Sequence, residues 1–266
     1  MNLLPFEPPA HAVPGRTVVG DGAADVDVLA GLRAKHKHVP PRLLAEAAPP
    51  ELRDRLARDE QALLARFLPA LAASIGAPAH VLEPWAPTPP RTYALLQRLA
   101  SADASPGPTL VALLDDTLAL LAPAAARAVL RELHAPDRCL LLSADGTREH
   151  ADTDPFGPAA ALAEHVLLHI NATHAATFDP AAFDYHAAWN AAASRVEETL
   201  VSARAHHVRV AGERIAFAAG ESLTIAHRHK HTPAALQALV VLGGWRMRAE
   251  LASEQRPLRL WLCDPL

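Results

Sequence analysis

The sequence is poor in aromatic residues and in cysteine, and it lacks the long apolar and basic runs that mark several classes of protein. Aromatic residues make up 5% of the 266 residues and hydrophobic residues 50%, so leucine, alanine and valine must build the core. No apolar run reaches the roughly 18 residues that a membrane-spanning helix requires. The net charge is −4 and no basic block is interleaved with aromatic residues, so nothing indicates membrane insertion or nucleic-acid binding.

The two cysteines, Cys139 and Cys263, lie in apolar stretches typical of buried strands. We expect them to be buried free thiols rather than a disulfide pair. Residues 1–12 contain a glutamate and three prolines but no basic segment, so they do not resemble a secretion signal. Together these features predict a cytoplasmic protein.

Residues 178–232 show the clearest pattern of predicted helices, strands and turns in the chain. The Ala-rich residues 181–194 predict a helix, and residues 196–204 predict a strand. Short strands follow, and Gly212 and Gly220 mark the turns.

Alternating histidines close this stretch at positions 227, 229 and 231. On an extended strand, His227, His229 and His231 project from one face. Neutral imidazoles bind Zn, Cu, Ni or Fe, so a transition-metal site is one hypothesis for this face. The intervening Arg228 and Lys230 are also typical of a solvated basic edge, and both interpretations stay open.

Ordered motifs run through the same stretch: Trp189-Asn190, Ser194-Arg195-Val196-Glu197, Val208-Arg209-Val210, Phe217-Ala-Ala-Gly-Glu221, Lys230 and Thr232. Together they resemble the substrate-binding segment of the histidine Nα-methyltransferases of ergothioneine biosynthesis. Members of that family depend on S-adenosylmethionine (SAM) and pair a Rossmann-like methyltransferase domain with a smaller substrate domain. The resemblance therefore implies an α/β fold, with a reduced Rossmann-like sheet and a smaller α+β substrate-type domain.

The resemblance also implies a division of the chain. We expect residues 1–24 to form an irregular N-terminal arm and residues 25–75 and 178–229 to form the substrate-type domain. Residues 76–177 and 230–266 then form the reduced Rossmann-like methyltransferase domain.

The stretch where the resemblance places the SAM-binding turn departs from the family. Residues 83–90 contain four prolines and no glycine, although glycine lets the backbone approach a ligand and proline removes a backbone donor. The interval between Leu82 and Thr109 has room for one helix and one loop. The strand whose terminal acid holds the ribose hydroxyls, and the strand after it, are therefore predicted to be missing.

The family pattern resumes at Leu110 and implies candidate substrate-pocket residues. Asp115 and Asp116, after a predicted strand, are either functional or the N-cap pair of a helix. Counting from Gly220-Glu221, the family's glutamate and serine that hold the substrate imidazole fall on Ala226 and Arg228. The pocket residues that the resemblance implies are Thr117, Asp145, Trp189 and Asn190.

Three hypotheses about function follow. Since the glycine turn, the ribose acid and the imidazole carboxylate are all replaced, the first is a diverged methyltransferase-like protein that has lost SAM-dependent histidine methylation and acts as a binding or partner protein. The second is an active SAM-dependent methyltransferase that acts on another small molecule. The third is a metal-binding protein or metalloenzyme that uses the histidine face. SAM and a transition metal are the candidate cofactors, and a small molecule or a protein is the candidate partner.

Overall fold

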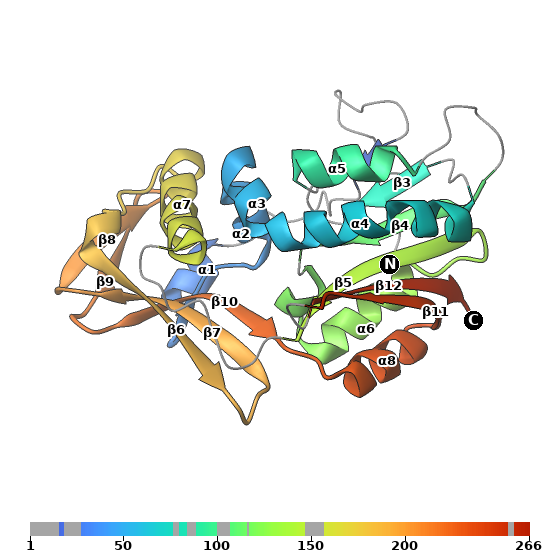
Figure 1. Ribbon diagram of the computed structural model, residues 1–266. Coiled ribbons are helices and arrows are strands. Elements are labelled where there is room, and N and C mark those ends of the chain that lie inside the picture. The colour runs from blue at the N-terminus through green and yellow to red at the C-terminus, as the bar shows by residue number, and fades with distance from the viewer. Residues whose placement is uncertain are drawn as a thin grey trace, which may run out of the picture.

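The computed structural model describes residues 16–18, 28–76, 80–83, 89–99, 107–115, 117–146, 157–254 and 258–266. These residues form a six-stranded sheet, a four-stranded sheet and a separate two-stranded hairpin, with helices packed on the sheets (Figure 1). The predicted α/β fold, with a reduced Rossmann-like sheet and a smaller α+β part, is confirmed. Within the described ranges, no helix is both long and apolar enough to cross a membrane.

The six-stranded sheet, here called the large sheet, has the strand order β1-β3-β4-β5-β12-β11. The first four of these strands run parallel, whereas β12 runs antiparallel to both of its neighbours. The parallel strands therefore end at one common edge, which we call the carboxyl edge. The strands are β1 (Arg16–Val18), β3 (His80–Glu83), β4 (Thr109–Leu113), β5 (Arg138–Asp145), β12 (Leu258–Pro265) and β11 (Trp245–Ala252).

Helices cover both faces of the large sheet. Helices α4 (Arg58–Ile75) and α5 (Pro90–Gln97) pack on one face, and α6 (Pro123–Glu132) and α8 (Pro233–Leu242) pack on the other (Figure 1). Strand β4 shows why its sequence is an unbroken apolar run. Leu110 and Ala112 join the core beneath α4 and α5, whereas Val111 joins the core on the other face, so every residue meets a covered surface.

Strand β1 lies within the segment that was predicted to be an irregular arm. It pairs in parallel with β3, with Thr17 opposite Leu82. An N-terminal strand thus fills the sheet position beyond β3, where deletion of a strand was predicted from the short interval after β3. The remainder of the predicted arm, residues 1–15 and 19–24, lies outside the described residues.

The four-stranded sheet, here called the small sheet, has the strand order β2-β10-β7-β6. Helices α1, α2, α3 and α7 share one hydrophobic core with this sheet and with the hairpin β8-β9. The strands are β2 (Lys37–His38), β10 (Ser222–His229), β7 (Arg195–Ser202), β6 (Phe183–Asn190), β8 (His206–Val210) and β9 (Glu213–Phe217). The helices are α1 (Val28–Arg33), α2 (Arg42–Ala47), α3 (Pro50–Leu56) and α7 (Pro158–Thr173).

Helices α4 and α7 each pack in the core of the sheet to which the predicted domain division did not assign them. The apolar stripe of α4 joins the core of the large sheet, although its residues were assigned to the substrate-type domain. Helix α7 joins the core of the small sheet, although its residues were assigned to the methyltransferase domain. The predicted helix at residues 181–194 is wrong, because residues 183–190 form strand β6 and pair along their whole length with β7.

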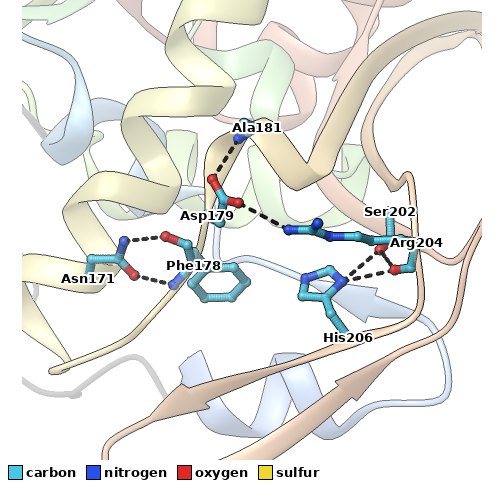
Figure 2. A network of polar contacts seen from close by, with 7 residues as sticks. All are labelled: Asn171, Phe178, Asp179, Ala181, Ser202, Arg204 and His206. Atoms are coloured by element: carbon cyan, nitrogen blue, oxygen red, sulfur yellow. Dashed lines mark hydrogen bonds and ion pairs between the residues drawn. The ribbon is translucent and has the colours of Figure 1, made fainter.

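Polar contacts fix the far end of the small sheet to α7 (Figure 2). The side chain of Asn171 exchanges two hydrogen bonds with the backbone of Phe178, at 2.7 and 2.8 Å. Asp179 caps the following turn through Ala181 N at 3.2 Å and pairs with Arg204 at 3.4 Å. This network joins the end of α7 to the start of β6 and therefore stabilises the small sheet.

The two cysteines are free and buried, as expected. Cys139 packs in the core beneath α4, and Cys263 packs in the core beneath α6 and α8. Burial raises the pKa of Cys139 to about 11 and that of Cys263 to about 12, so both thiols stay protonated at neutral pH.

Candidate functional site

The carboxyl edge of the large sheet collects polar side chains at the ends of three neighbouring strands. Glu83 ends β3 and is almost fully buried, and Asp145 ends β5. Asp115 follows β4 in a left-handed conformation, with φ of 58°. In open α/β sheets, ligands bind at the carboxyl ends of parallel strands, so this edge is the first place to look for a site.

Helix α4 holds the turn that follows β4. The Glu60 carboxylate, 5% exposed, accepts a hydrogen bond from Asp115 N at 2.8 Å. A left-handed backbone is unfavourable for a residue other than glycine, so this contact stabilises a strained turn at the edge. The turn leads into a short 3-10 helix, η1 (Thr117–Leu120), where the Thr117 hydroxyl donates to Leu114 O. Asp116, one of the two candidate aspartates, lies outside the described residues.

The start of α5 is fixed at the same edge by polar contacts. Gln61 Nε2 donates to Asp54 Oδ1 at 3.0 Å and to Thr92 Oγ1 at 3.3 Å. The same Asp54 oxygen accepts from Arg91 N at 3.2 Å. An N–H group at the start of α5 is therefore already satisfied by a carboxylate of this chain.

The small sheet meets the carboxyl edge at the end of β10. Helix η1 packs against β10, and its Leu120 contacts the core of the small sheet. Lys230, 6% exposed, forms an ion pair with Asp145 at 3.0 Å and donates its backbone N–H to Ser194 O at 2.9 Å. These contacts connect strand β5 of the large sheet to strands β10 and β7 of the small sheet.

A β-bulge in β10 decides which side chains face this junction. Thr224 pairs with Thr199, but Ala226 pairs with the adjacent Glu198, so Ile225 is an extra residue in the ladder. An extra residue reverses the alternation of the side chains that follow it. We call the face of the small sheet that carries Val196, Glu198 and Leu200 the inner face; it packs toward the helices, and the opposite side is the outer face.

The inner face carries a buried ion pair beside the junction. Arg228 Nε donates to Glu198 Oε1 at 2.7 Å, and the two side chains are 19% and 7% exposed. Ala226 and Ala187 pair with Glu198 on either side, and Trp189 shares its row with Val196 and Arg228. A charged pair, an indole ring and two short side chains thus line the part of the inner face nearest the carboxyl edge.

The outer face carries the histidines. In the ladder, His227 pairs with Glu197 and His229 pairs with Arg195. Arg195 donates to Glu197 at 2.6 and 2.8 Å, and Asn190 Nδ2 donates to the same oxygen at 2.9 Å.

Partial burial, and then the nearby Arg195 charge, lower the pKa of both His227 and His229 below the ordinary value. Burial alone raises the pKa of Glu197, but hydrogen bonds from Arg195 and Asn190 lower it overall. At neutral pH the outer face therefore carries neutral imidazoles beside an ionised carboxylate.

The structure brings only part of the predicted site together. Thr117 and Asp145 lie at the carboxyl edge, and Trp189 lies on the inner face nearby. Asn190 points to the outer face, where it also accepts from Ala193 N at 3.0 Å and caps the β6-β7 turn. Its neighbour Trp189 points the other way because successive residues of a strand alternate faces.

The predicted metal face is not assembled as a metal centre. His227 and His229 share the outer face, but β10 ends at His229, and His231 lies beyond it. Across the described parts of the chain, no group of three or more His, Cys, Asp or Glu side chains is placed to hold a metal ion. Metal binding is therefore not supported.

Sequence reasoning did not single out Glu60, which holds the turn after β4, or the ion pair between Glu198 and Arg228. Glu198 had a readable signal, since it alternates with Val196 and Leu200 and so shares their buried face. Arg228 had none, because the bulge that turns it inward depends on how β10 pairs with β7.

Comparison with known proteins shows the family to which the chain belongs. Residues 89–265, more than half of the chain, match the family described as histidine-specific methyltransferase, SAM-dependent. The chain belongs to this family. The match contains β4, β5, η1 and all of strands β6, β7 and β10, which form the junction.

A curated relative points the same way. Over 150 residues the chain is 34% identical to the histidine N-alpha-methyltransferase of Mycolicibacterium smegmatis, and the alignment covers 53% of this chain and 47% of that protein. The aligned region thus spans about half the length of that relative.

Two solved structures are similar at a lower level. The CcbJ methyltransferase from Streptomyces caelestis has a TM-score of 0.36 and 14% identity, covering 82% of this chain and 97% of that chain. A SAM-dependent methyltransferase from Clostridium acetobutylicum has a TM-score of 0.32 and 5% identity, covering 59% of this chain and 57% of that chain. Similarities with TM-scores this low support no conclusion about function.

The prediction that the chain has lost SAM-dependent methylation and acts as a partner protein is wrong. The match to a SAM-dependent histidine-specific family and the 34% identity to a curated member overturn it. The prediction rested on three replaced site components, of which the imidazole carboxylate was located by counting positions along the chain. Counting placed that carboxylate at Ala226, but it cannot reveal that the neighbouring strand β7 places Glu198 directly beside Ala226.

Proposed function

We propose that the chain is an active SAM-dependent methyltransferase that acts on a small molecule at the junction between the carboxyl edge and the inner face. The observation that carries the proposal is the family match over residues 89–265, because it spans both sides of that junction. The name of the M. smegmatis relative makes histidine the first acceptor to test.

At the carboxyl edge, the carboxylate of Glu83 suits SAM binding, whereas the start of α5 does not. Carboxylates at the ends of strands accept hydrogen bonds from ribose hydroxyls and ammonium groups, and Glu83 supplies such a carboxylate at the end of β3. The N-terminus of α5 does not offer its Arg91 N–H, since Asp54 accepts it. We therefore assign Glu83 and Thr117 to the cofactor side, and no contact to the α5 backbone.

The acceptor side of the proposed site is the inner face. SAM, when bound, supplies an electrophilic methyl group. The indole of Trp189 offers an apolar wall for the acceptor, and the ion pair between Lys230 and Asp145 holds β10 against β5. Fixing the two sheets in this way positions an acceptor against the cofactor side, which is the main requirement for a transfer between two bound molecules.

Calorimetric titration with SAM and with its demethylated product, S-adenosylhomocysteine (SAH), tests the proposal. We expect micromolar binding of both, and SAM-dependent release of SAH when an acceptor is added. Glu83→Gln should weaken SAM binding about tenfold, since it removes one charge-assisted hydrogen bond. The matched control Arg195→Gln, on the outer face, should bind SAM as the unaltered protein does. Absence of SAM binding by the unaltered protein contradicts the proposal.

A further inference from the structure

The ion pair on the inner face uses only part of the Glu198 carboxylate. Glu198 Oε1 accepts a hydrogen bond from Arg228 Nε at 2.7 Å. The second oxygen, Oε2, has no hydrogen-bond partner among the residues that the structure describes. A carboxylate accepts several hydrogen bonds, two or so at each oxygen, so Glu198 keeps the capacity to accept a further one.

The β-bulge in β10 sets a short side chain opposite this carboxylate. A regular ladder after Thr224 would place Ile225 opposite Glu198, whereas the bulge places Ala226 there. On the other neighbouring strand, Ala187 lies opposite Glu198. Directly opposite Cβ atoms lie about 4.5–5.5 Å apart, so longer side chains at these two positions would cover the carboxylate.

The adjoining part of the inner face keeps some access to solvent. Ala187 and Trp189 are half-buried, whereas Glu198 and Ala226 are buried. Trp189 lies in the next row, opposite Val196, and its indole offers a flat apolar surface on which a planar ring can stack. A planar ligand that rests on Trp189 can therefore direct a polar edge toward Glu198.

The charges beside Glu198 favour a neutral donor on this edge. Since Arg228 Nε lies 2.7 Å from the carboxylate, a positively charged ring on Oε2 would also meet the guanidinium charge, and an anion would meet the Glu198 charge. A neutral imidazole avoids both, because it donates one ring N–H and carries no charge. The ordinary pKa of the histidine ring is about 6.5, so the free amino acid supplies this form at pH 8.

We propose that, in the methyltransferase proposed above, Glu198 Oε2 accepts the ring N–H of a neutral imidazole in the methyl acceptor, and that Glu198 thereby determines the acceptor specificity. The carboxylate that the family resemblance places at Ala226 of β10 is, in this chain, supplied from β7.

Calorimetry on the SAH-loaded protein at pH 8 tests this with L-histidine and two probes without a ring N–H in their neutral form, Nτ-methyl-L-histidine and L-phenylalanine. We expect histidine to bind about tenfold more tightly than either probe. Glu198→Gln should weaken histidine binding about tenfold, because a neutral amide is a weaker acceptor than a carboxylate, and should leave the SAH and phenylalanine affinities unchanged. The outer-face control Glu197→Gln should leave all three affinities unchanged.

A second variant, Ala187→Val, keeps the Glu198–Arg228 pair and so guards against a folding defect in Glu198→Gln. Its added methyl groups lie opposite the carboxylate, so histidine binding should weaken about tenfold at unchanged SAH affinity. The matched control Ala188→Val, at the next and exposed position on the outer face, should retain both affinities.

Absence of SAH binding by the unaltered protein contradicts the proposed function. If SAH binds, the inference alone is overturned by equal affinities for histidine and the two probes. It is also overturned by an unchanged histidine affinity in Ala187→Val, or in Glu198→Gln protein that still binds SAH.

Discussion

The inner and outer faces of the small sheet each carry one arginine–carboxylate pair, but burial gives the two pairs different consequences. On the outer face, Arg195 and Glu197 are 26% and 30% exposed and lie 2.6 Å apart. On the inner face, Arg228 and Glu198 are 19% and 7% exposed and lie 2.7 Å apart. Exposed ion pairs contribute little to stability, whereas breaking a buried pair leaves a charge that water cannot reach. We therefore expect the loss of the inner-face carboxylate to cost more stability than the loss of the outer-face carboxylate.

The largest expected effect comes from placing a charge at the bulge residue. Ile225 is 1% exposed and joins the core of the small sheet. Ile225→Asp should lower the free energy of unfolding by more than about 4 kcal/mol, because it buries a carboxylate in an apolar core. We expect urea unfolding to show a smaller loss in Ile225→Ala, which shortens the side chain but keeps it apolar. Equal losses in the two variants would contradict the burial of the bulge residue.

The two carboxylates give the next largest contrast. Glu198→Ala should lower the free energy of unfolding by about 3–5 kcal/mol, because it removes one buried carboxylate that pairs with Arg228. Glu197→Ala, one residue earlier on the outer face, should lower it by no more than about 1 kcal/mol. Chemical denaturation of both variants at pH 7 measures the difference. Similar losses would contradict the assignment of the two faces.

The pH dependence of stability should come in part from the outer face. The pKa values of His227 and His229 are lowered on folding, so below about pH 6.5 the unfolded chain binds more protons at these residues than the folded chain does. Their contribution is therefore complete above the unfolded value of about 6.5 and is lost as the pH falls through the lower folded values. Thermal midpoints measured from pH 8 to pH 5 should fall less steeply in His227→Gln/His229→Gln. An unchanged slope would show that these imidazoles titrate alike in both states.

The smallest expected effect concerns metal. Among the described residues, no group of three His, Cys, Asp or Glu side chains is placed to hold a metal ion. We therefore expect Ni²⁺ or Zn²⁺ added to chelator-treated protein to bind no better than to His229→Ala. Metal analysis after gel filtration measures this. Stoichiometric metal that disappears in His229→Ala would restore the metal hypothesis.

Much of the fold follows from local patterns, whereas the site depends on pairing. The apolar run of β4 indicates a strand covered on both faces, and the structure has such a strand. In β6, Phe183, Tyr185, Ala187 and Trp189 alternate as a strand requires, but the many alanines favoured a helix, and pairing with β7 overrides that propensity.

The faces of β10 could not be predicted in the same way. Leu223 and Ile225 are both buried, and a regular alternation continues this pattern to His227 and His229. The structure breaks the pattern at Ile225, since Ala226 is buried as well. No local feature of the sequence fixes the position of the bulge. The sequence therefore predicted a histidine face and did not predict that Arg228 lies on the inner face.

The most direct test of the central claim is a crystal structure of the protein with SAH and L-histidine. The account predicts SAH at the carboxyl edge, near Glu83 and Thr117, and histidine at the inner face beside Trp189. SAH bound elsewhere, or histidine bound among the imidazoles of the outer face, would contradict it.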